Sequence, residues 1–382
     1  MDFVVQVTAN VTAVADNSTR SGATLDQARC NFVVMLPSDV SVSCLIVVFF
    51  SVYCLSLAVN CFALLALLQL EDLYWQPRLI LLINLAVSDI LLTTTLVPSV
   101  LYCLINRHTV LLGFWCQAEL FIGTICIFNT LSTLTLMAVE RYLYICHAIH
   151  YLRVLTPRRV RLSLLIVWLL AVAMCSIYII LLNAGSVSPE GATMRLLCEP
   201  DVLEKQMGFP PAASAFRKAW GLASVMMSLT AYVLSYFKMY REARNAVEPF
   251  NRTNGRARNT VIFYSAMFVL QVIPYWLRFV TDFLWELDLE AMREHTAATG
   301  IHLLLLVLIT LTPCINPIIY GLRNREVRRA FPLIAGRLRC PSTCRCHGGG
   351  VRQFLFFLKR VTPLMQRDRL GGTTCSRRGE FV

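Results

Sequence analysis

Three side chains that can carry charge or hydrogen bonds stand side by side at Glu140, Arg141 and Tyr142, at the end of an apolar run that begins near Phe114. An acid beside a guanidinium is costly at the edge of a membrane unless the two neutralise each other or meet another polar partner. A buried ion pair adds little stability by itself, so Glu140 and Arg141 are candidates for a pair that opens when the protein changes state. The alternative is that both are ordinary interfacial charges extending toward the lipid headgroups.

A second polar group lies inside the apolar runs, around Asp89. A carboxylate in the middle of a membrane is expensive, and we therefore treat it as a candidate functional residue. Together with polar side chains from neighbouring helices it could hold a hydrated cation, because hard cations prefer oxygen ligands. The alternative is a set of hydrogen bonds that only holds the helices together. The predicted sodium site consists of Asp89, Thr130, Thr312 and Asn316.

Prolines interrupt two further runs, at Pro274 and at Pro317. A proline removes one helical hydrogen bond and frees a carbonyl, so each position predicts a kink about which the end of a helix can reposition. Asn316 and Tyr320 lie beside the second kink. We expect them to exchange hydrogen-bond partners with the charged residues named above when this kink moves.

These residues must be positioned by membrane-spanning helices. The chain has 382 residues, of which 57% are hydrophobic and 15% are charged, whereas soluble domains carry roughly 25% charged residues. Seven apolar runs are each long enough to cross a bilayer, which takes about 20 residues of helix. The sequence therefore predicts an all-α membrane protein built as a bundle of seven transmembrane helices. The runs are Val40–Leu68, Leu79–Leu104, Phe114–Cys146, Leu162–Leu182, Ala219–Tyr240, Thr260–Phe283 and Ala297–Tyr320.

The polar segments between the runs predict the orientation. Asn10 and Asn17 each open a glycosylation sequon in the tail before the first run, which favours an N-terminus outside the cell. Seven spans then place the C-terminus inside, and most of the 35 Lys and Arg residues fall in segments assigned to the cytoplasm, as the positive-inside rule requires. We therefore predict a multi-pass protein of the plasma membrane. The net charge of +12 is therefore concentrated at the cytoplasmic side, where the basic residues face anionic lipid. This distribution argues against a nucleic-acid partner.

Domain boundaries follow from this topology. We expect an extracellular glycosylated tail over residues 1–39, the seven-helix domain over 40–322, an amphipathic juxtamembrane helix over 323–336 and a basic cytoplasmic tail over 337–382. Three cysteines in the last segment lie near basic residues, which favours palmitoylation over a zinc site with His347. They are Cys340, Cys344 and Cys346.

Two cysteines fall on the extracellular side of the predicted topology, Cys116 at the start of the third run and Cys198 in the long loop after the fourth. That compartment is oxidising, so we expect a disulfide that ties the loop to the helix. The alternative is two free thiols. Cys30 and Cys103 lie on or near the same side and form a second candidate pair.

The order of these motifs along the chain resembles the rhodopsin-like (class A) G protein-coupled receptors, from about Val40 to Phe331. Finer features resemble fish odorant receptors, namely the segments Met137–Tyr142, Arg256–Thr260 and Pro317–Arg323. Any one motif is weak, but their occurrence in order, spread over the expected spans and loops, is specific. The motif residues are Asn60, Asp89, Cys116, Glu140, Arg141, Tyr142, Trp168, Cys198, Pro274, Asn316, Pro317 and Tyr320.

The resemblance implies a receptor that transduces the binding of a small extracellular ligand, an odorant, to a heterotrimeric G protein. Membrane lipids and arrestin are further implied partners, and no cofactor is expected apart from an allosteric sodium ion. The residues assigned to coupling and switching are Glu140, Arg141, Tyr142, Tyr236, Asn316, Pro317 and Tyr320.

The same resemblance places the ligand between the outer halves of the third, fifth, sixth and seventh spans. The wall carried over by position is aromatic, rich in methionine and nearly uncharged, as expected for a small apolar or amphipathic ligand. Gly123 stands where amine receptors carry an aspartate, so a biogenic amine is not expected. Charges near the mouth, Glu119, Glu199, Arg278 and Asp282, could select a polar head group, although solvated loop-end charges are the favoured interpretation. The predicted ligand-binding residues are Gly123, Thr124, Ile127, Met226, Met227, Tyr275, Trp276, Phe279, His302 and Leu306.

Other protein classes lack the residues they need. The sequence has neither a His-Glu-x-x-His zinc motif nor a Gly-x-Ser-x-Gly nucleophile elbow, so no enzymatic activity is expected. A retinal-binding photosensor needs a lysine in the last span, and Ala297–Tyr320 contains none. A transporter or channel is disfavoured because no internal repeat is visible. The remaining alternative is an orphan class A receptor for a lipid or peptide ligand.

Overall fold

The structure is a computed structural model that describes most of the chain between residues 23 and 323. The chain divides into two compact units, Met1–Phe331 and Pro332–Val382. All described residues belong to the first unit. They are residues 23–68, 76–184, 195–208, 211–245, 269, 272–277, 280–281 and 295–323.

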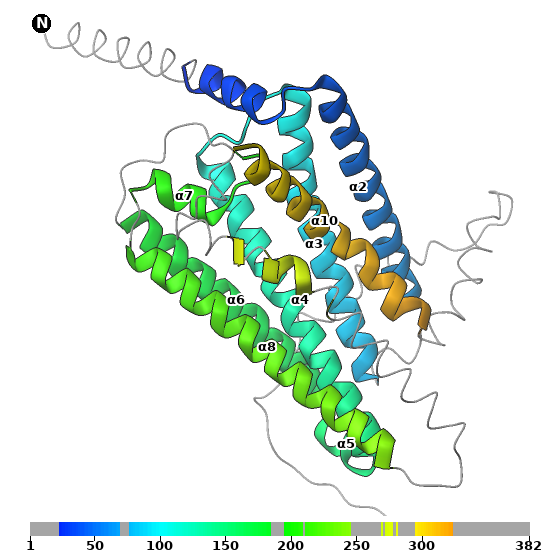
Figure 1. Cartoon of the computed structure of the whole chain (residues 1–382). Coiled ribbons are helices and arrows are strands. Elements are labelled where there is room, and N and C mark those ends of the chain that lie inside the picture. The colour runs from blue at the N-terminus through cyan, green and yellow to red at the C-terminus, as the bar shows by residue number, and fades with distance from the viewer. Residues whose placement is uncertain are drawn as a thin grey trace, which may run out of the picture. The chain divides into compact units, whose positions relative to one another are not determined.

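Among these residues, 6 helices are long and apolar enough to cross a membrane. They coincide with the first five and the seventh of the predicted runs, which confirms the prediction of an all-α membrane bundle. The sixth run is described at residues 269, 272–277 and 280–281, all of them helical. The predicted amphipathic helix lies outside the described residues apart from Arg323. The long helices are α2 (Asp39–Leu68), α3 (Pro77–Asn106), α4 (Phe114–Cys146), α6 (Pro157–Ala184), α8 (Pro211–Asn245) and α10 (His295–Arg323) (Figure 1).

Local sequence explains where several of these helices begin and end. Pro77, Pro157 and Pro211 are the first residues of α3, α6 and α8. At this position the missing N–H costs no hydrogen bond and the fixed φ is already helical. Arg107, directly after α3, is left-handed with φ 53°, and its N–H donates to the Cys103 carbonyl. This contact satisfies one of the carbonyls left open at a helix end.

The helix α4 is the centre of the bundle. It packs against α3, α6 and α8, and its most apolar segment is more deeply buried than those of the other long helices. On the other side, α10 packs against α2 and α3. Polar side chains of α3 therefore face both α4 and α10, which is the arrangement that a shared internal network requires. Below, the end of the bundle that carries Cys116 is called the outer end, and the end that carries Glu140 the inner end.

Two short helices lie in the connections between the long ones. The helix α5 (Ala148–Val154) follows α4 at the inner end, and α7 (Pro200–Gln206) precedes α8 at the outer end (Figure 1). Both positions matter for the sites described below. The helix α5 carries the partner of a buried acid, and α7 carries a buried acid whose partners lie on α6 and α8.

A further helix, over residues 23–35, lies within the segment predicted to be a polar tail. Its side chains Ala28, Phe32 and Met35 are buried, and Phe32 and Met35 join an apolar cluster with residues of α3 such as Val100. The backbone N–H of Thr109 donates to the Ala28 carbonyl at 3.3 Å. This helix is thus part of the packed outer end.

Candidate functional site

The polar residues in the middle of the bundle meet across α3 and α10. Asn316 donates a hydrogen bond from its side-chain amide to Asp89 Oδ2 at 2.8 Å, and both side chains are almost completely buried. The second carboxylate oxygen, Asp89 Oδ1, has no hydrogen-bond partner among the described residues. Both residues border a small cavity of about 20 Å³, roughly what one water molecule needs. The cavity is lined by Asn60, Ala63, Leu67, Leu82, Leu85, Ala86, Asp89, Asn316 and Pro317.

The structure brings together part of the predicted sodium site. Asp89 and Asn316 line the cavity, and Thr130 and Thr312 are not among its lining residues. The Thr312 hydroxyl donates within its own helix to the Leu308 carbonyl at 3.0 Å. The buried Thr130 hydroxyl has no partner among the described residues. The side-chain oxygens that could bind a cation in this cavity therefore belong to carboxylate and amide groups.

Asn60 of α2 satisfies the carbonyl that the proline kink exposes. A proline at position 317 cannot donate to the carbonyl four residues earlier, which belongs to Pro313. The Asn60 side-chain amide donates to that carbonyl at 2.9 Å, and also to the Ser56 carbonyl at 3.0 Å. The segment of α10 around Pro317 is thereby tied to α2, so a movement there requires this contact to change.

A second network joins α3, α4 and α6 through Asn84. The indole N–H of Trp168 donates to Asn84 Oδ1 at 2.9 Å. Asn84 Nδ2 donates to Thr133 Oγ1 at 2.8 Å, and Asn129 donates to Ser88 on the next turn of α3. These hydrogen bonds hold three helices together. The polar residues of this network therefore match the alternative to a cation site, in which they only join helices.

At the inner end, Glu140 has a partner that sequence reasoning missed. The hydroxyl of Tyr151, on α5, donates to Glu140 Oε1 at 2.9 Å. The sequence predicts Arg141 as the partner of this acid, and Arg141 itself is half-buried. Burial and the nearby Glu140 carboxylate raise the pKa of Tyr151. The acid of the motif is thus buried beneath a loop helix, which disfavours a purely interfacial charge.

Other aromatic side chains lie at the inner end beside the motif. Tyr142 exchanges a hydrogen bond with His147 Nε2 at 3.0 Å, and Lys238 Nζ lies 5.6 Å from the centre of the Tyr142 ring. Tyr236 of α8 is buried and stacks on Tyr232, with ring centres 4.3 Å apart. Residues of α4 and α8 that were assigned to coupling therefore lie at the same end of the bundle.

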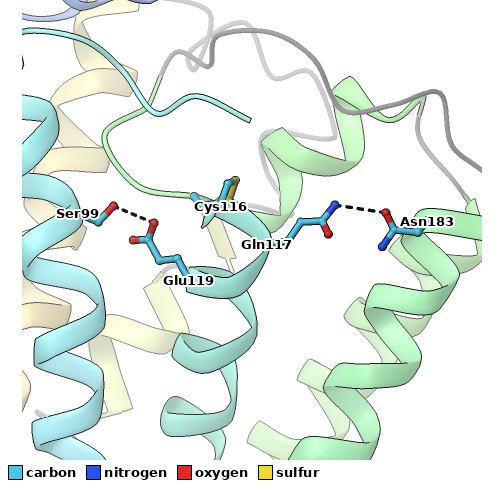
Figure 2. The surroundings of a disulfide bond; sticks show 6 residues. Ser99, Cys116, Gln117, Glu119 and Asn183 are labelled. Carbon is cyan, nitrogen blue, oxygen red and sulfur yellow. Dashed lines mark hydrogen bonds between the residues drawn. A yellow bond between two sulfur atoms is a disulfide. The ribbon is translucent and has the colours of Figure 1, made fainter. Parts of the chain in front are cut away.

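At the outer end the predicted disulfide is confirmed. Cys116 and Cys198 are bonded, with Cα atoms 5.2 Å apart, and both are buried. Figure 2 shows this bond beside Gln117, whose side chain donates to Asn183 of α6 at 3.3 Å. Cys30 and Cys103 are free, so the second candidate pair is not formed.

The loop that contains Cys198 enters the outer end of the bundle. Leu196 is completely buried, and the Val110 N–H donates to the Arg195 carbonyl at 3.0 Å. Glu199 is 4% exposed, and its Oε1 lies 3.0 Å from His302 Nδ1 on α10. The disulfide and this contact hold the loop between α4 and α10.

The helix α7 is anchored by a second buried acid. Glu204 accepts hydrogen bonds from Arg217 at 2.8 and 3.1 Å and from the Tyr178 hydroxyl at 3.0 Å. These partners come from α8 and α6. Sequence reasoning missed this contact, and its signal was weak because Glu204 falls in a short polar stretch.

Two of the four charged residues predicted near the mouth are not exposed to solvent as expected. Glu119 and Glu199 are buried rather than solvated, so the interpretation of these two as loop-end charges is wrong. The cause is the path of the loop, which the disulfide draws against α4. Arg278 and Asp282 lie outside the described residues.

The predicted ligand-binding residues fall into three groups. Gly123, Tyr275, His302 and Leu306 are buried, and the apolar cluster around Tyr275 includes the half-buried Ile127. A second group is exposed along the helices, and Phe279 lies outside the described residues. The exposed residues are Thr124, Met226, Met227 and Trp276.

Several other predictions concern residues outside the described part of the chain. The side chain of Tyr320 belongs here, together with the sequons and the tail cysteines. These residues are Asn10, Asn17, Cys340, Cys344 and Cys346.

Comparison with known proteins gives a consistent picture. The family described as 7 transmembrane receptor (rhodopsin family) matches residues 59–320. Olfactory receptor 2AG1 of Homo sapiens is 24% identical over 299 residues, which cover 76% of this chain and 88% of that relative. Olfactory receptor 13A1 of Homo sapiens is 25% identical over 265 residues, 67% of this chain and 74% of that relative. Olfactory receptor 10P1 of Homo sapiens is 26% identical over 291 residues, 75% of this chain and 88% of that relative.

Proposed function

The chain belongs to the 7 transmembrane receptor (rhodopsin) family, and from this premise we propose that it is an odorant receptor, which transduces binding of a small extracellular ligand to a heterotrimeric G protein. Relatives that match most of the chain are olfactory receptors, which supports an odorant as the ligand class. The family is one of receptors and not of enzymes.

The observation that carries the proposal is the placement of Glu140, Arg141 and Tyr142. They lie at the inner end of α4, the helix that packs against α3, α6 and α8. Tyr236 of α8 lies at the same end, inside the apolar cluster of Met137. A partner that contacts this end therefore meets the central helix of the bundle directly.

Ligand binding would act by shifting a conformational equilibrium. A ligand changes the populations only by as much as its affinities for the two states differ. Pro317 is the position of α10 best placed to move, because the Asn60 side chain holds the Pro313 carbonyl that the proline leaves without a helical donor. In the active state Arg141 would engage the G protein, and Glu140 would keep Tyr151 as its partner.

A sodium ion is a proposed allosteric ligand of the cavity beside Asp89. The residues fit such an ion, because Asp89 Oδ1 is buried without a partner among the described residues and the lining amides supply further oxygens. Asp89, Asn60 and Asn316 would hold it. A bound cation would compensate the buried charge of Asp89 and so favour the state in which the cavity exists.

Topology and further partners complete the proposal. We place the N-terminus outside the cell and the C-terminus in the cytoplasm, in the plasma membrane, because basic residues are concentrated in the segments assigned to the inside. Arrestin and anionic lipid are proposed partners of the cytoplasmic side.

A cell-surface signalling assay tests the proposed function. Cells expressing the full chain are exposed to water-soluble odorants, and G protein activation is read with several G protein reporters. Arg141→Ala should abolish the response at unchanged surface expression. Arg153→Ala removes an exposed arginine from the same end and should leave it intact. A response that survives Arg141→Ala would contradict the coupling mechanism, and a silent wild type at full surface expression would favour a receptor for a lipid or peptide.

A further inference from the structure

An acid at the outer end of the bundle uses only half of its hydrogen-bonding capacity. Glu119 of α4 is 8% exposed, and Ser99 of α3 donates to its Oε2 at 2.9 Å (Figure 2). The other oxygen, Oε1, is enclosed and has no partner among the described residues. A buried carboxylate is costly unless a cation or a hydrogen-bond donor meets it.

A second buried acid, Glu199, is held near Glu119 by the disulfide bond. Cys116 precedes Glu119 by three residues, which places both on one face of α4. Its disulfide partner Cys198 directly precedes Glu199. The bond therefore holds both acids close to one covalent link at the outer end of the bundle.

Positive charge in this cluster does not balance the acids. Within the described residues the cation beside Glu199 is Arg195, at 2.8 Å, and the same guanidinium lies 3.5 Å from Asp201. One guanidinium thus faces two acids, and Glu119 is a third acid of this cluster, with no ion pair among the described residues. His302 Nδ1 lies 2.9 Å from the Arg195 guanidinium and 3.0 Å from Glu199 Oε1. Its Nε2 is buried without a partner in the part of the chain that the structure describes.

The unsatisfied atoms adjoin the predicted ligand wall. Glu119 stands four residues before Gly123, so the two lie on the same face of α4, one turn apart. Gly123 has α3 close against it, since a Cβ at this position would lie 3.3 Å from Leu96. The predicted ligand wall therefore has an acid one turn further out than Gly123, the position at which amine receptors carry an aspartate.

We propose that Glu119, Glu199 and His302 form the head-group subsite of the ligand site and that this subsite takes a small ligand with a protonated primary amine. The proposal rests on the receptor function proposed above. An ammonium group has one positive charge and three donors, which supplies both the charge and the donor that Glu119 lacks. An alcohol supplies a donor without the charge. A carboxylate would add a negative charge beside two others.

The test measures binding directly, so that it does not depend on G protein coupling. The purified full chain is titrated with hexylamine, hexanol and hexanoic acid, and with benzylamine and benzyl alcohol, and stabilisation against thermal unfolding gives each affinity. Amines should bind more tightly than alcohols of the same skeleton. Glu119→Gln should weaken amines by about 10- to 100-fold, as expected for a hydrogen bond to a charged group, and alcohols by less than about threefold.

Two further variants keep the test decisive. Glu242→Gln makes the same change at an exposed position of α8 near the inner end and should leave every affinity unchanged. Glu119→Asp keeps the charge but withdraws it by one methylene, and should weaken amines less than Glu119→Gln does. It replaces Glu119→Gln if that variant fails to fold. Amines that bind no better than alcohols, or that ignore both changes at Glu119, would overturn the subsite.

The two proposals fail in different ways. If amines bind through Glu119 but no G protein reporter responds, the subsite stands and the receptor function proposed above is wrong. If alcohols or acids activate the receptor while amines neither bind nor activate, the function stands and the amine subsite is wrong.

Discussion

The hydroxyl of Tyr151 on α5 and the carboxylate of Glu140 on α4 share a hydrogen bond of 2.9 Å. Glu140 is buried, and Arg141 follows it directly in the sequence. We expect the phenol and the guanidinium to be alternative donors to this carboxylate. A donor on α5 that holds Glu140 would then leave Arg141 less neutralised and more available to the G protein proposed as its partner.

Tyr151→Phe tests this competition, because it removes the hydroxyl and keeps the ring. We expect Glu140 to pair more completely with Arg141 and basal G protein signalling to fall by about threefold to tenfold, since a hydrogen bond to a charged group contributes about 1.5–3 kcal/mol and only part of it separates the two states. Signalling is measured at matched surface expression. Tyr144→Phe is the control, since the Tyr144 ring packs edge-on against Tyr151 and the variant keeps that ring. Increased basal signalling in Tyr151→Phe would mean that the contact holds the inactive state.

The effect of Tyr151→Phe should not vary with pH in the neutral range. Burial, together with the Glu140 carboxylate, raises the pKa of Tyr151 above its ordinary value of 10.0. The stabilisation from a raised pKa is complete below the ordinary value and is lost only as the pH rises through the folded-state value. The ratio of wild-type to variant signalling should therefore be constant from about pH 6 to about pH 8. A ratio that changes across this interval would assign the titration to another group.

Asp89→Asn should remove the proposed response to sodium. In the wild type, replacing sodium chloride by choline chloride at constant ionic strength should change agonist affinity by about fivefold or more, the lower range of allosteric coupling. The variant keeps an oxygen for the Asn316 amide but lacks the charge that attracts the ion. Thr312→Val is the control, because that hydroxyl is used within α10 and does not line the cavity. A sodium effect that persists in Asp89→Asn would place the ion elsewhere.

The contact between Asn60 and the Pro313 carbonyl predicts a non-additive pair of substitutions. Asn60→Ala leaves this carbonyl buried without its donor, which should cost about 1–3 kcal/mol of stability. In a Pro317→Ala background the new N–H at position 317 can take the same carbonyl, so Asn60→Ala should then cost much less. Thermal unfolding of the wild type, both single variants and the double variant gives the interaction free energy. Additive effects would show that the proline does not create the need for Asn60.

Much of the fold could be predicted because hydropathy along the chain encodes the spans directly. The same holds for the Cys116–Cys198 bond, since topology put both thiols in one oxidising compartment. The helix over residues 23–35 was missed although Ala28, Phe32 and Met35 follow a helical spacing. The two sequons in that tail indicate an extracellular location but carry no information on whether the segment folds.

Partners supplied by loops could not be predicted in the same way. The contact of Tyr151 with Glu140 depends on how a short loop folds back, and neither spacing nor composition contains that path. Burial of Glu119 and Glu199 depends on the disulfide drawing a loop into the bundle. Once the bond is predicted, the position of Glu199 directly after Cys198, and of Glu119 three residues after Cys116, is a usable signal, because residues close to a disulfide inside a bundle are held near the core.

The ion pair between Glu204 and Arg217, which anchors α7, is buried, whereas the pair between Asp39 and Arg107 is exposed. The two pairs allow the effect of burial to be measured within one molecule. Glu204 is 2% exposed and is held by Arg217 and Tyr178. Arg217→Met leaves this acid buried without its cation, which should cost about 3–5 kcal/mol. The double variant Glu204→Met with Arg217→Met should recover most of that loss, because apolar side chains of similar size can replace a buried pair.

Arg107→Met is the matched comparison for these variants. Its ion pair with Asp39 is shorter, at 2.6 Å, but the two side chains are 58% and 78% exposed. Solvent screens such a pair, so the loss should be below about 1 kcal/mol. Thermal unfolding of the purified chain, with surface expression as a second readout, ranks the three variants. If Arg107→Met and Arg217→Met are equally destabilised, burial does not set the strength of these contacts, and the α7 anchor then has no special role in holding the outer loop.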